Sequence, residues 1–280
     1  MGKTVAVAKA PVPKTQRSIS KQIAATAEAA LMDDSRRQLL KLVLQQMKML
    51  GAPTILMGLV ILVMSHPDLP GYEQNVDWVE YFAGQKAVSR SMLSANLVTL
   101  SFELLDNAVT QNLMHEAGMI YALYIALRVK DGGGSNTAPV CSTWVWVNRA
   151  TSQRSVYRPL GSSSVPSVRL ANTVVTRTML LCWLFTSRKV FWVLEQPCNS
   201  LMEKHPRFAE LAARIRVYRT TINMQDFGAC SKKPTWIYSA HSFISELAAY
   251  AGRYGVQSGP AKAKLPSITN HTGPLVQGFT

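Results

Sequence analysis

The chain has 280 residues, of which 48% are hydrophobic and 16% are charged. This composition excludes a wholly disordered protein and supplies one hydrophobic core with some residues left for extensions. The formal net charge of +14 favours a polyanion or an anionic membrane surface as the partner. Residues 139–235 carry 14 basic and four acidic side chains, a net +10. This segment is therefore either a basic face for nucleic acid or a set of solvated helix faces.

The four cysteines, Cys141, Cys182, Cys198 and Cys230, form no CxxC pair, and no histidine stands at ligand spacing from them. We therefore expect neither a zinc site nor a disulfide framework, and a reducing, intracellular compartment, nuclear or cytoplasmic, fits best. The first thirty residues lack the apolar stretch of a secretory signal. They are rich in Lys, Ala, Ser and Thr, a composition that also suits an organelle transit peptide.

The N-terminal quarter is expected to form an extension that precedes the main domain in the sequence. Residues 1–21 are rich in Pro, Lys and Ala, which predicts a disordered basic tail, and residues 22–65 show the apolar spacing of a helical extension. Within the extension, residues 49–65 (MLGAPTILMGLVILVMS) carry no charge, and their 17 positions approach the ~20 that span a bilayer. They form either a hairpin packed on the next domain or a membrane anchor. Residues 66–75 are expected to be a linker.

Strand patterns alternate with helix patterns from residue 76 to residue 253, which predicts one α/β domain with a doubly wound, Rossmann-like sheet. Strands are expected at residues 76–84 (running into a glycine turn), 97–103, 137–141, 190–195, 217–224 and 234–239. Helices are expected at residues 86–94, 118–130, 167–188, 199–214 and 242–253. The glycines at 132–134 are expected to end the helix 118–130 and to turn the chain. Residues 254–280 are expected to be a flexible tail.

Residues suited to ligand binding follow several of these strands. Ligands of doubly wound sheets bind at the carboxyl ends of the strands, where the strand order reverses. The residues that stand there are Phe82, Ala83, Gly84, Glu103, Pro139, Cys141 and Glu195. The glycine turn would let the backbone approach a nucleotide-like ligand. Glu103, at the end of the next strand, is placed to accept hydrogen bonds from ribose hydroxyls.

Four short motifs in this segment stand in a recognisable order. They are FAG at 82–84, PVC at 139–141, LEQP at 194–197 and DFGACSKKPTWIYS at 226–239. Their order and spacing resemble those of the DNA and RNA cytosine-5 methyltransferases, a family with the class I S-adenosylmethionine-dependent fold. The stretch CSTWVWVNRATSQRS at 141–155 is similar to the loop that follows the nucleophile in that family. The resemblance extends over residues 76–239.

The resemblance implies a mechanism and a set of site residues. Cys141, as a thiolate, would attack C6 of a cytosine, and Glu195 would hold the ring at N3. S-adenosylmethionine would be bound by Phe82, Ala83, Gly84, Glu103 and Pro139. The substrate would be contacted by Trp144, Asn148, Arg149, Arg154 and Lys233. A duplex substrate would require base flipping, whereas single-stranded RNA would not.

Three functions remain open beside one another. The first is a cytosine-5 methyltransferase acting on RNA or DNA. The second is an inactive methyltransferase fold that binds nucleic acid, because the chain departs from the family pattern at Lys86, Val140, Val145 and Thr235 and shows no large target-recognition domain after residue 239. The third is a membrane-associated domain anchored by residues 49–65. Trp144 and Trp146 could stack against a base or simply cover the sheet.

Overall fold

The computed structural model describes residues 34–66, 69 and 71–254. The expected tail at 1–21, the start of the helical extension and residues 255–280 lie outside this part of the chain. Within it, one mixed sheet has the strand order β2-β1-β3-β4-β6-β5. The strands are β1 (Val76–Tyr81), β2 (Thr99–Phe102), β3 (Val129–Thr137), β4 (Phe191–Pro197), β5 (Tyr218–Asn223) and β6 (Pro234–Ser239). The predicted α/β class is confirmed, and the six-stranded mixed sheet is compatible with the predicted Rossmann-like fold.

The sheet is parallel from β2 to β4, and the next strand in the sheet, β6, runs in the opposite direction. β1 pairs in parallel with both β2 and β3, and β3 pairs in parallel with β4. β6 runs antiparallel to β4 on one side and to β5 on the other. The chain moves outward from β1 to β2 and then returns to β3 on the other side of β1. The order therefore reverses between β1 and β3, and a ligand site is expected at their carboxyl ends.

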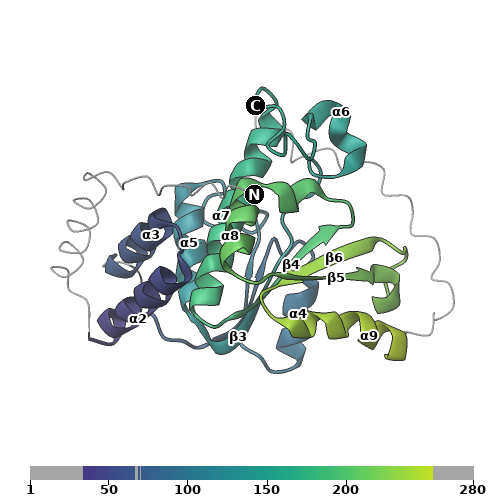
Figure 1. Ribbon diagram of the computed structural model, residues 1–280. Helices are drawn as coiled ribbons and strands as arrows, with labels where there is room; N and C mark the ends of the chain where they lie inside the picture. Colours follow the sequence, from purple (N-terminus) through teal and green to yellow (C-terminus); the bar gives the residue numbers. More distant parts are fainter. Residues whose placement is uncertain (1–33, 67–68, 70, 255–280) are drawn as a thin grey trace, which may run out of the picture.

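Helices cover both faces of the sheet, as Figure 1 shows. The helices are α2 (Asp34–Leu50), α3 (Thr54–Ser65), α4 (Ala87–Ser94), α5 (Glu116–Leu127), α6 (Arg149–Ser152), α7 (Pro166–Ser187), α8 (Pro206–Arg214) and α9 (Ser245–Tyr254). The hydroxyl of Tyr81 donates to Ala122 O of α5, whereas its neighbour Glu80 accepts from Ser89 of α4. Because side chains alternate along a strand, α5 and α4 cover opposite faces. The larger core lies on the α5 face, together with α7 and α8.

The segment 49–65 does not form one continuous helix. α2 ends at Leu50, Gly51 turns the chain with a φ of +73°, and α3 begins after Pro53. Leu56, Val60 and Val63 of α3 are buried in the same core as α5 and α7. α2 contacts α7, and α3 contacts α5. Among the described residues, no helix combines the length and the apolar character that crossing a membrane requires.

The glycine run at 132–134 differs from its expected role. β3 continues through it, where the sequence had predicted a turn and a strand only at 137–141. The cause is Trp78, the partner of Gly134 in the β1–β3 register, whose ring a Cβ at Gly134 would overlap. The Trp78 indole also donates to Asn136 Oδ1 at 2.8 Å. Gly134 therefore makes room for an indole, and only Gly132, with a φ of +75°, bends the strand.

The single helix expected at 199–214 is divided into two. A short 3-10 helix covers Leu201–Lys204, and α8 begins only at Pro206. Because a residue before proline avoids the helical conformation, His205 is extended, with φ −62° and ψ 135°. Its Nδ1 accepts the backbone N–H of Arg207 at 3.2 Å and so caps α8.

Candidate functional site

The turn after β1 and the carboxylate after β2 meet at the carboxyl edge of the sheet. Phe82 and Gly84 have φ values of +59° and +48°, and Ala83 between them is buried. The backbone N–H of Gly84 donates to Glu103 Oε2 at 2.6 Å. A Cβ at Gly84 would meet no atom within 4 Å, so this backbone faces open space. The structure thus brings together the two segments that the sequence assigned to cofactor binding.

Further bonds tie these two segments to each other. Glu103 Oε1 accepts the backbone N–H of Leu105 at 3.3 Å, so both of its oxygens have partners within the protein. Lys86 stands where the family pattern has its last glycine and adopts a φ of +52°. Its amine pairs with Asp106 at 2.7 Å. The turn therefore has a fixed shape without a ligand.

Cys141, Glu195 and Lys233 come together from three separate segments. Lys233 Nζ lies 3.2 Å from Glu195 Oε1, at the carboxyl end of β4. The pKa of the Cys141 thiol is raised, chiefly by burial and then by the negative charge of Glu195, while the positive charge of Lys233 lowers it. Both charges are therefore close enough to shift the pKa of the thiol, although burial has the larger effect. We call these three residues the Cys141 cluster.

Gln196 fixes the loop that carries Cys141, a role that the sequence did not reveal. The side chain is buried, and its Nε2 donates to Pro139 O at 2.7 Å. Its Oε1 accepts the hydroxyl of Ser200 at 3.0 Å. Because Gln196 follows Glu195 on the strand, the two side chains point to opposite faces, one bracing the loop and one joining the Cys141 cluster. The alternation of side chains along the strand could have predicted from the sequence that Gln196 and Glu195 point to opposite faces.

Trp144 and Arg154 lie in the interior rather than at a substrate surface. Their exposed fractions are 0% and 2%, and the Arg154 guanidinium carbon lies 3.4 Å from the centroid of the Trp144 ring. The guanidinium donates to Thr143 Oγ1, Pro159 O, Val168 O and Asn172 Oδ1. Burial lowers the pKa of Arg154 to about 10, so it stays charged at neutral pH. In this conformation the pair fastens residues 143–159 to α7.

Asn148 and Arg149 lie at the surface of the same loop. Asn148 Nδ2 donates to Ser142 O at 2.5 Å and closes the turn after Cys141. The guanidinium carbon of Arg149 lies 3.3 Å from the centroid of the Trp146 ring, and Trp146 itself is 65% exposed. Tyr157, further along the loop, is also exposed. Of the expected substrate contacts, Arg149 and Lys233 are thus the cationic ones that reach the surface.

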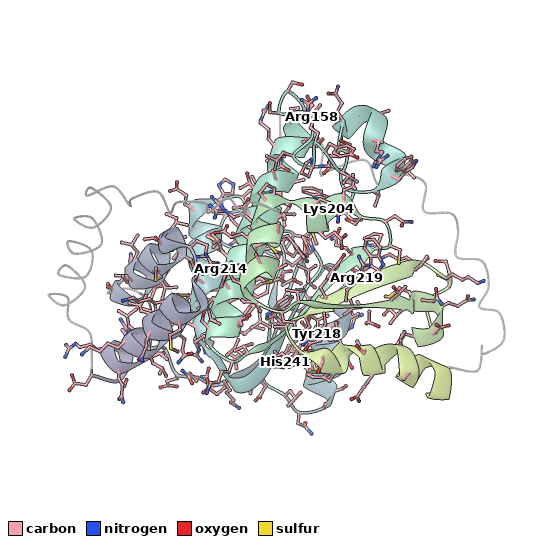
Figure 2. All side chains as sticks on the ribbon, in the orientation of Figure 1. Arg158, Lys204, Arg214, Tyr218, Arg219 and His241 are labelled. Atoms are coloured by element: carbon pink, nitrogen blue, oxygen red, sulfur yellow. The ribbon has the colours of Figure 1, made fainter. Side chains whose placement is uncertain are left out.

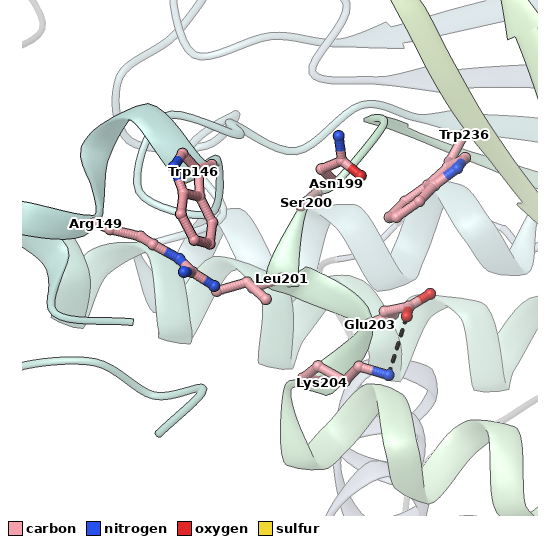
Figure 3. Close-up of a pocket in the computed structure, with 8 residues that line it drawn as sticks. All are labelled: Trp146, Arg149, Asn199, Ser200, Leu201, Glu203, Lys204 and Trp236. Atoms are coloured by element: carbon pink, nitrogen blue, oxygen red, sulfur yellow. Dashed lines mark ion pairs between the residues drawn. The ribbon is translucent and has the colours of Figure 1, made fainter. Parts of the chain in front are cut away.

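A hollow of about 350 Å³ opens beside this loop (Figure 3). We call it the tryptophan hollow; its lining residues are Trp146, Arg149, Asn199, Ser200, Leu201, Glu203, Lys204 and Trp236. Figure 3 shows Trp146 and Trp236 on opposite sides of it. In the view of Figure 2, Arg158, Lys204 and Arg219 lie one below the other. The sequence had singled out Trp146 and Arg149 but not Trp236, Asn199 or Lys204.

Within the described residues, no group of three His, Cys, Asp or Glu side chains is arranged to hold a metal ion. No protein-family model matches the chain, and neither a curated protein nor a solved structure gives a significant match. The function of the chain is therefore inferred from its motifs and from the placement of these side chains.

Proposed function

We propose that the chain is an S-adenosylmethionine-dependent methyltransferase of the cytosine-5 type that acts on RNA or DNA through Cys141. The grouping of Cys141, Glu195 and Lys233 carries this proposal. A nucleophile, a carboxylate and a cation lie together at the carboxyl edge that also holds the Gly84 turn and Glu103. The proposed family has these groups in the same chain order.

The sheet supports the same family. Class I methyltransferases also close a parallel sheet with one reversed strand inserted between its neighbours, as β6 lies between β4 and β5 here. The order reverses between β1 and β3, whose carboxyl ends lead into the Phe82–Gly84 turn and the loop of Cys141. Cofactor and substrate would thus meet where doubly wound sheets bind their ligands.

The residues at this edge fit a ribose-bearing cofactor. Open space lies beside Gly84, and Glu103 presents a carboxylate at the end of β2, where ribose hydroxyls could replace the N–H groups that it accepts now. Residues Phe82, Ala83, Gly84, Glu103 and Pro139 would hold S-adenosylmethionine, which when bound supplies the methyl group. Gln196 would keep Pro139 in place.

The charges around Cys141 suit a thiol that is activated by its substrate. If the proton of the Cys141 thiol passes to Glu195 and is shared there with N3 of a cytosine ring, the negative charge beside the sulfur decreases, and the thiolate becomes more favourable. The thiolate then adds to C6, and the electron pair of the C5–C6 double bond becomes available at C5. The cofactor would supply the methyl group to C5 and leave as S-adenosylhomocysteine; loss of the C5 proton to a base would then let the Cys141 thiolate leave and restore the ring.

Two variants test this proposal. Cys141→Ala should abolish methyl transfer to RNA or DNA while binding of S-adenosylhomocysteine, measured by calorimetry, stays unchanged. Glu103→Ala should weaken that binding. Cys230→Ala is the matched control, because Cys230 is an exposed free thiol outside the Cys141 cluster. Methyl transfer by Cys141→Ala at the wild-type rate, or no binding of S-adenosylhomocysteine by folded protein, would contradict the proposal.

A second function has specific support. Both oxygens of Glu103 and the amine of Lys86 are engaged within the protein, and the pKa of Cys141 is raised rather than lowered. These features favour an inactive methyltransferase fold that binds nucleic acid through its basic residues. Such a protein would bind RNA or DNA in a strongly salt-dependent manner, and neither cofactor nor Cys141→Ala would change the affinity.

A further inference from the structure

The tryptophan hollow lies on the other side of β4 from Glu195. In the β4–β6 register, Glu195 pairs with Ile237, which packs with Ile244 next to α9. Gln196 pairs with Trp236, which packs against the larger core on the opposite face. The hollow and the Cys141 cluster are thus neighbours across the end of a single strand. They are also joined by a hydrogen bond from Leu201 N to Trp144 O at 2.9 Å, which connects the wall of the hollow to the Cys141 loop.

Each of the two indoles is held by an arginine. Arg149 lies over Trp146, and the guanidinium carbon of Arg219 lies 4.3 Å from the centroid of the Trp236 ring. Such cation–π contacts favour one orientation of each ring. Both tryptophans line the hollow, and 65% of Trp146 is exposed to solvent.

The charged residues around the hollow favour an anion. Glu203 is the one carboxylate among its lining residues, and that carboxylate bonds to Lys204, Arg219 and the hydroxyl of Tyr238. Its negative charge is therefore neutralised within the protein. Arg149 Nε is buried without a hydrogen-bond partner. The lining thus carries one net positive charge, Arg149 and Lys204 against Glu203, beside two aromatic rings and the exposed amide of Asn199.

We infer that the tryptophan hollow binds one unpaired nucleobase of a single-stranded nucleic acid, with Arg149 and Lys204 next to its phosphates. Aromatic rings that stack a base and cations that follow the backbone are what single-strand binding requires. A volume of about 350 Å³ suits one nucleoside, near the lower end of small-molecule sites. A base inside a duplex is stacked on its neighbours and cannot enter. This base site deepens the proposed function, but base binding itself does not depend on methyl transfer. Only the link between the two sites rests on the proposed function: two nucleotides of one strand would then occupy the hollow and the Cys141 cluster.

The test is fluorescence anisotropy of the full chain with a labelled single strand of about 12 nucleotides, as RNA and as DNA, and with the matching duplex. Wild-type protein should bind the single strands more tightly than the duplex. Trp146→Ala should weaken single-strand binding about tenfold, since stacking contributes ~1–3 kcal/mol per base, and Trp146→Phe should retain most of it. Tyr157→Ala, which removes a fully exposed aromatic of the same loop outside the hollow, should change binding less than about twofold.

Because Trp236 is half-buried in the sheet, Trp236→Phe is used in place of the alanine variant, and it should bind like wild type while Trp236→Leu binds less tightly. Equal losses in Trp146→Ala and Tyr157→Ala would overturn the inference, as would equal affinity for duplex and single strand. Competition by polyglutamate at the same concentration as the oligonucleotide would also overturn the inference, because the surface would then bind any polyanion and not a nucleobase.

Failure of this inference can be told apart from failure of the proposed function. The titrations contain no cofactor and are repeated with Cys141→Ser. If Cys141→Ser binds single strands like wild type and wild type transfers no methyl group, the base site stands without the enzyme. If wild type transfers methyl groups and Trp146→Ala changes neither affinity nor KM, the enzyme stands without the base site.

Discussion

Lys233 Nζ lies 3.2 Å from Glu195 Oε1, and the two charges act in opposite directions on the thiol of Cys141. Glu195 raises the pKa of that thiol and Lys233 lowers it, in addition to the larger effect of burial. The thiolate fraction at a given pH is therefore adjustable from two positions. Neither residue is adjacent to Cys141 in the sequence.

Substitution of either charged residue is expected to change the alkylation rate of Cys141. Glu195→Gln should speed the reaction with iodoacetamide a few-fold at pH 8, because the thiol pKa falls. Lys233→Met should slow it for the opposite reason. Mass spectrometry of each cysteine peptide gives the rates, with exposed Cys230 as the internal control. Rates that stay unchanged, or change in the same direction for both variants, would contradict the assigned charges.

His205 is expected to make stability depend on pH. Burial, followed by the charges of Arg154 and Arg207, lowers its pKa from 6.5 to about 4, so the folded protein holds it neutral. Between pH 6.5 and pH 4, His205 binds a proton more readily in the unfolded chain than in the folded protein. The stabilisation that neutral His205 gives the folded protein is therefore complete above pH 6.5 and is lost as the pH falls toward 4. The loss could reach about 3 kcal/mol.

Urea unfolding of wild type and His205→Asn measures this effect. Asparagine can also cap α8, so the variant should fold, and its free energy of unfolding should fall less between pH 6.5 and pH 4 than that of wild type. Carboxylates titrate in the same range in both proteins, and the difference between the two curves isolates His205. Parallel curves would refute the assignment.

Replacement of Arg154 is expected to destabilise the fold even when charge is kept. Arg154→Leu removes the donor of four hydrogen bonds, two of them buried and two part-buried, and Arg154→Lys can neither form all four nor stack on Trp144. Each should cost about 3 kcal/mol and lower Tm by about 10 °C, measured by calorimetry. The matched control is Arg158→Leu, at an exposed position four residues on, which should change Tm little.

Replacement by alanine is expected to change the stability of the protein in opposite directions at two glycines. Gly134→Ala brings a Cβ against the Trp78 ring and should destabilise the protein by about 2 kcal/mol or more. Gly58→Ala, in the middle of α3 with nothing within 4 Å of the new Cβ, should stabilise it by about 0.5–1 kcal/mol. Thermal unfolding measures both. A stabilising Gly134→Ala would show that Trp78 can move aside at little cost.

The buried runs of the sequence predicted most of the sheet. VFWVLE and PTWIYS became β4 and β6 with small or no shifts in their bounds, because a short apolar run with turn signals on both sides has few other arrangements. The glycines at 132–134 were misjudged because their role depends on Trp78, which is distant in the sequence. Local conformational preference carries no information about such a contact.

The candidate site was predictable only where it follows the ends of strands. Cys141 and Glu195 could be placed at one edge because parallel strands end together. Trp144 and Trp146 could not be told apart, since each has an arginine over its ring and only the tertiary fold buries the first and exposes the second. Trp236 was missed because it reaches the hollow only through the reversed insertion of β6 beside β4.

That insertion also determines when the protein can fold during its synthesis. β6 is the last strand in the chain, yet it lies between β4 and β5, and β5 has no other partner in the sheet. Until residue 239 leaves the ribosome, the edge of β4 offers unpaired N–H and C=O groups to any extended chain nearby. A ribosome that stops a few codons before Pro234 would therefore release an aggregation-prone polypeptide rather than a smaller working domain.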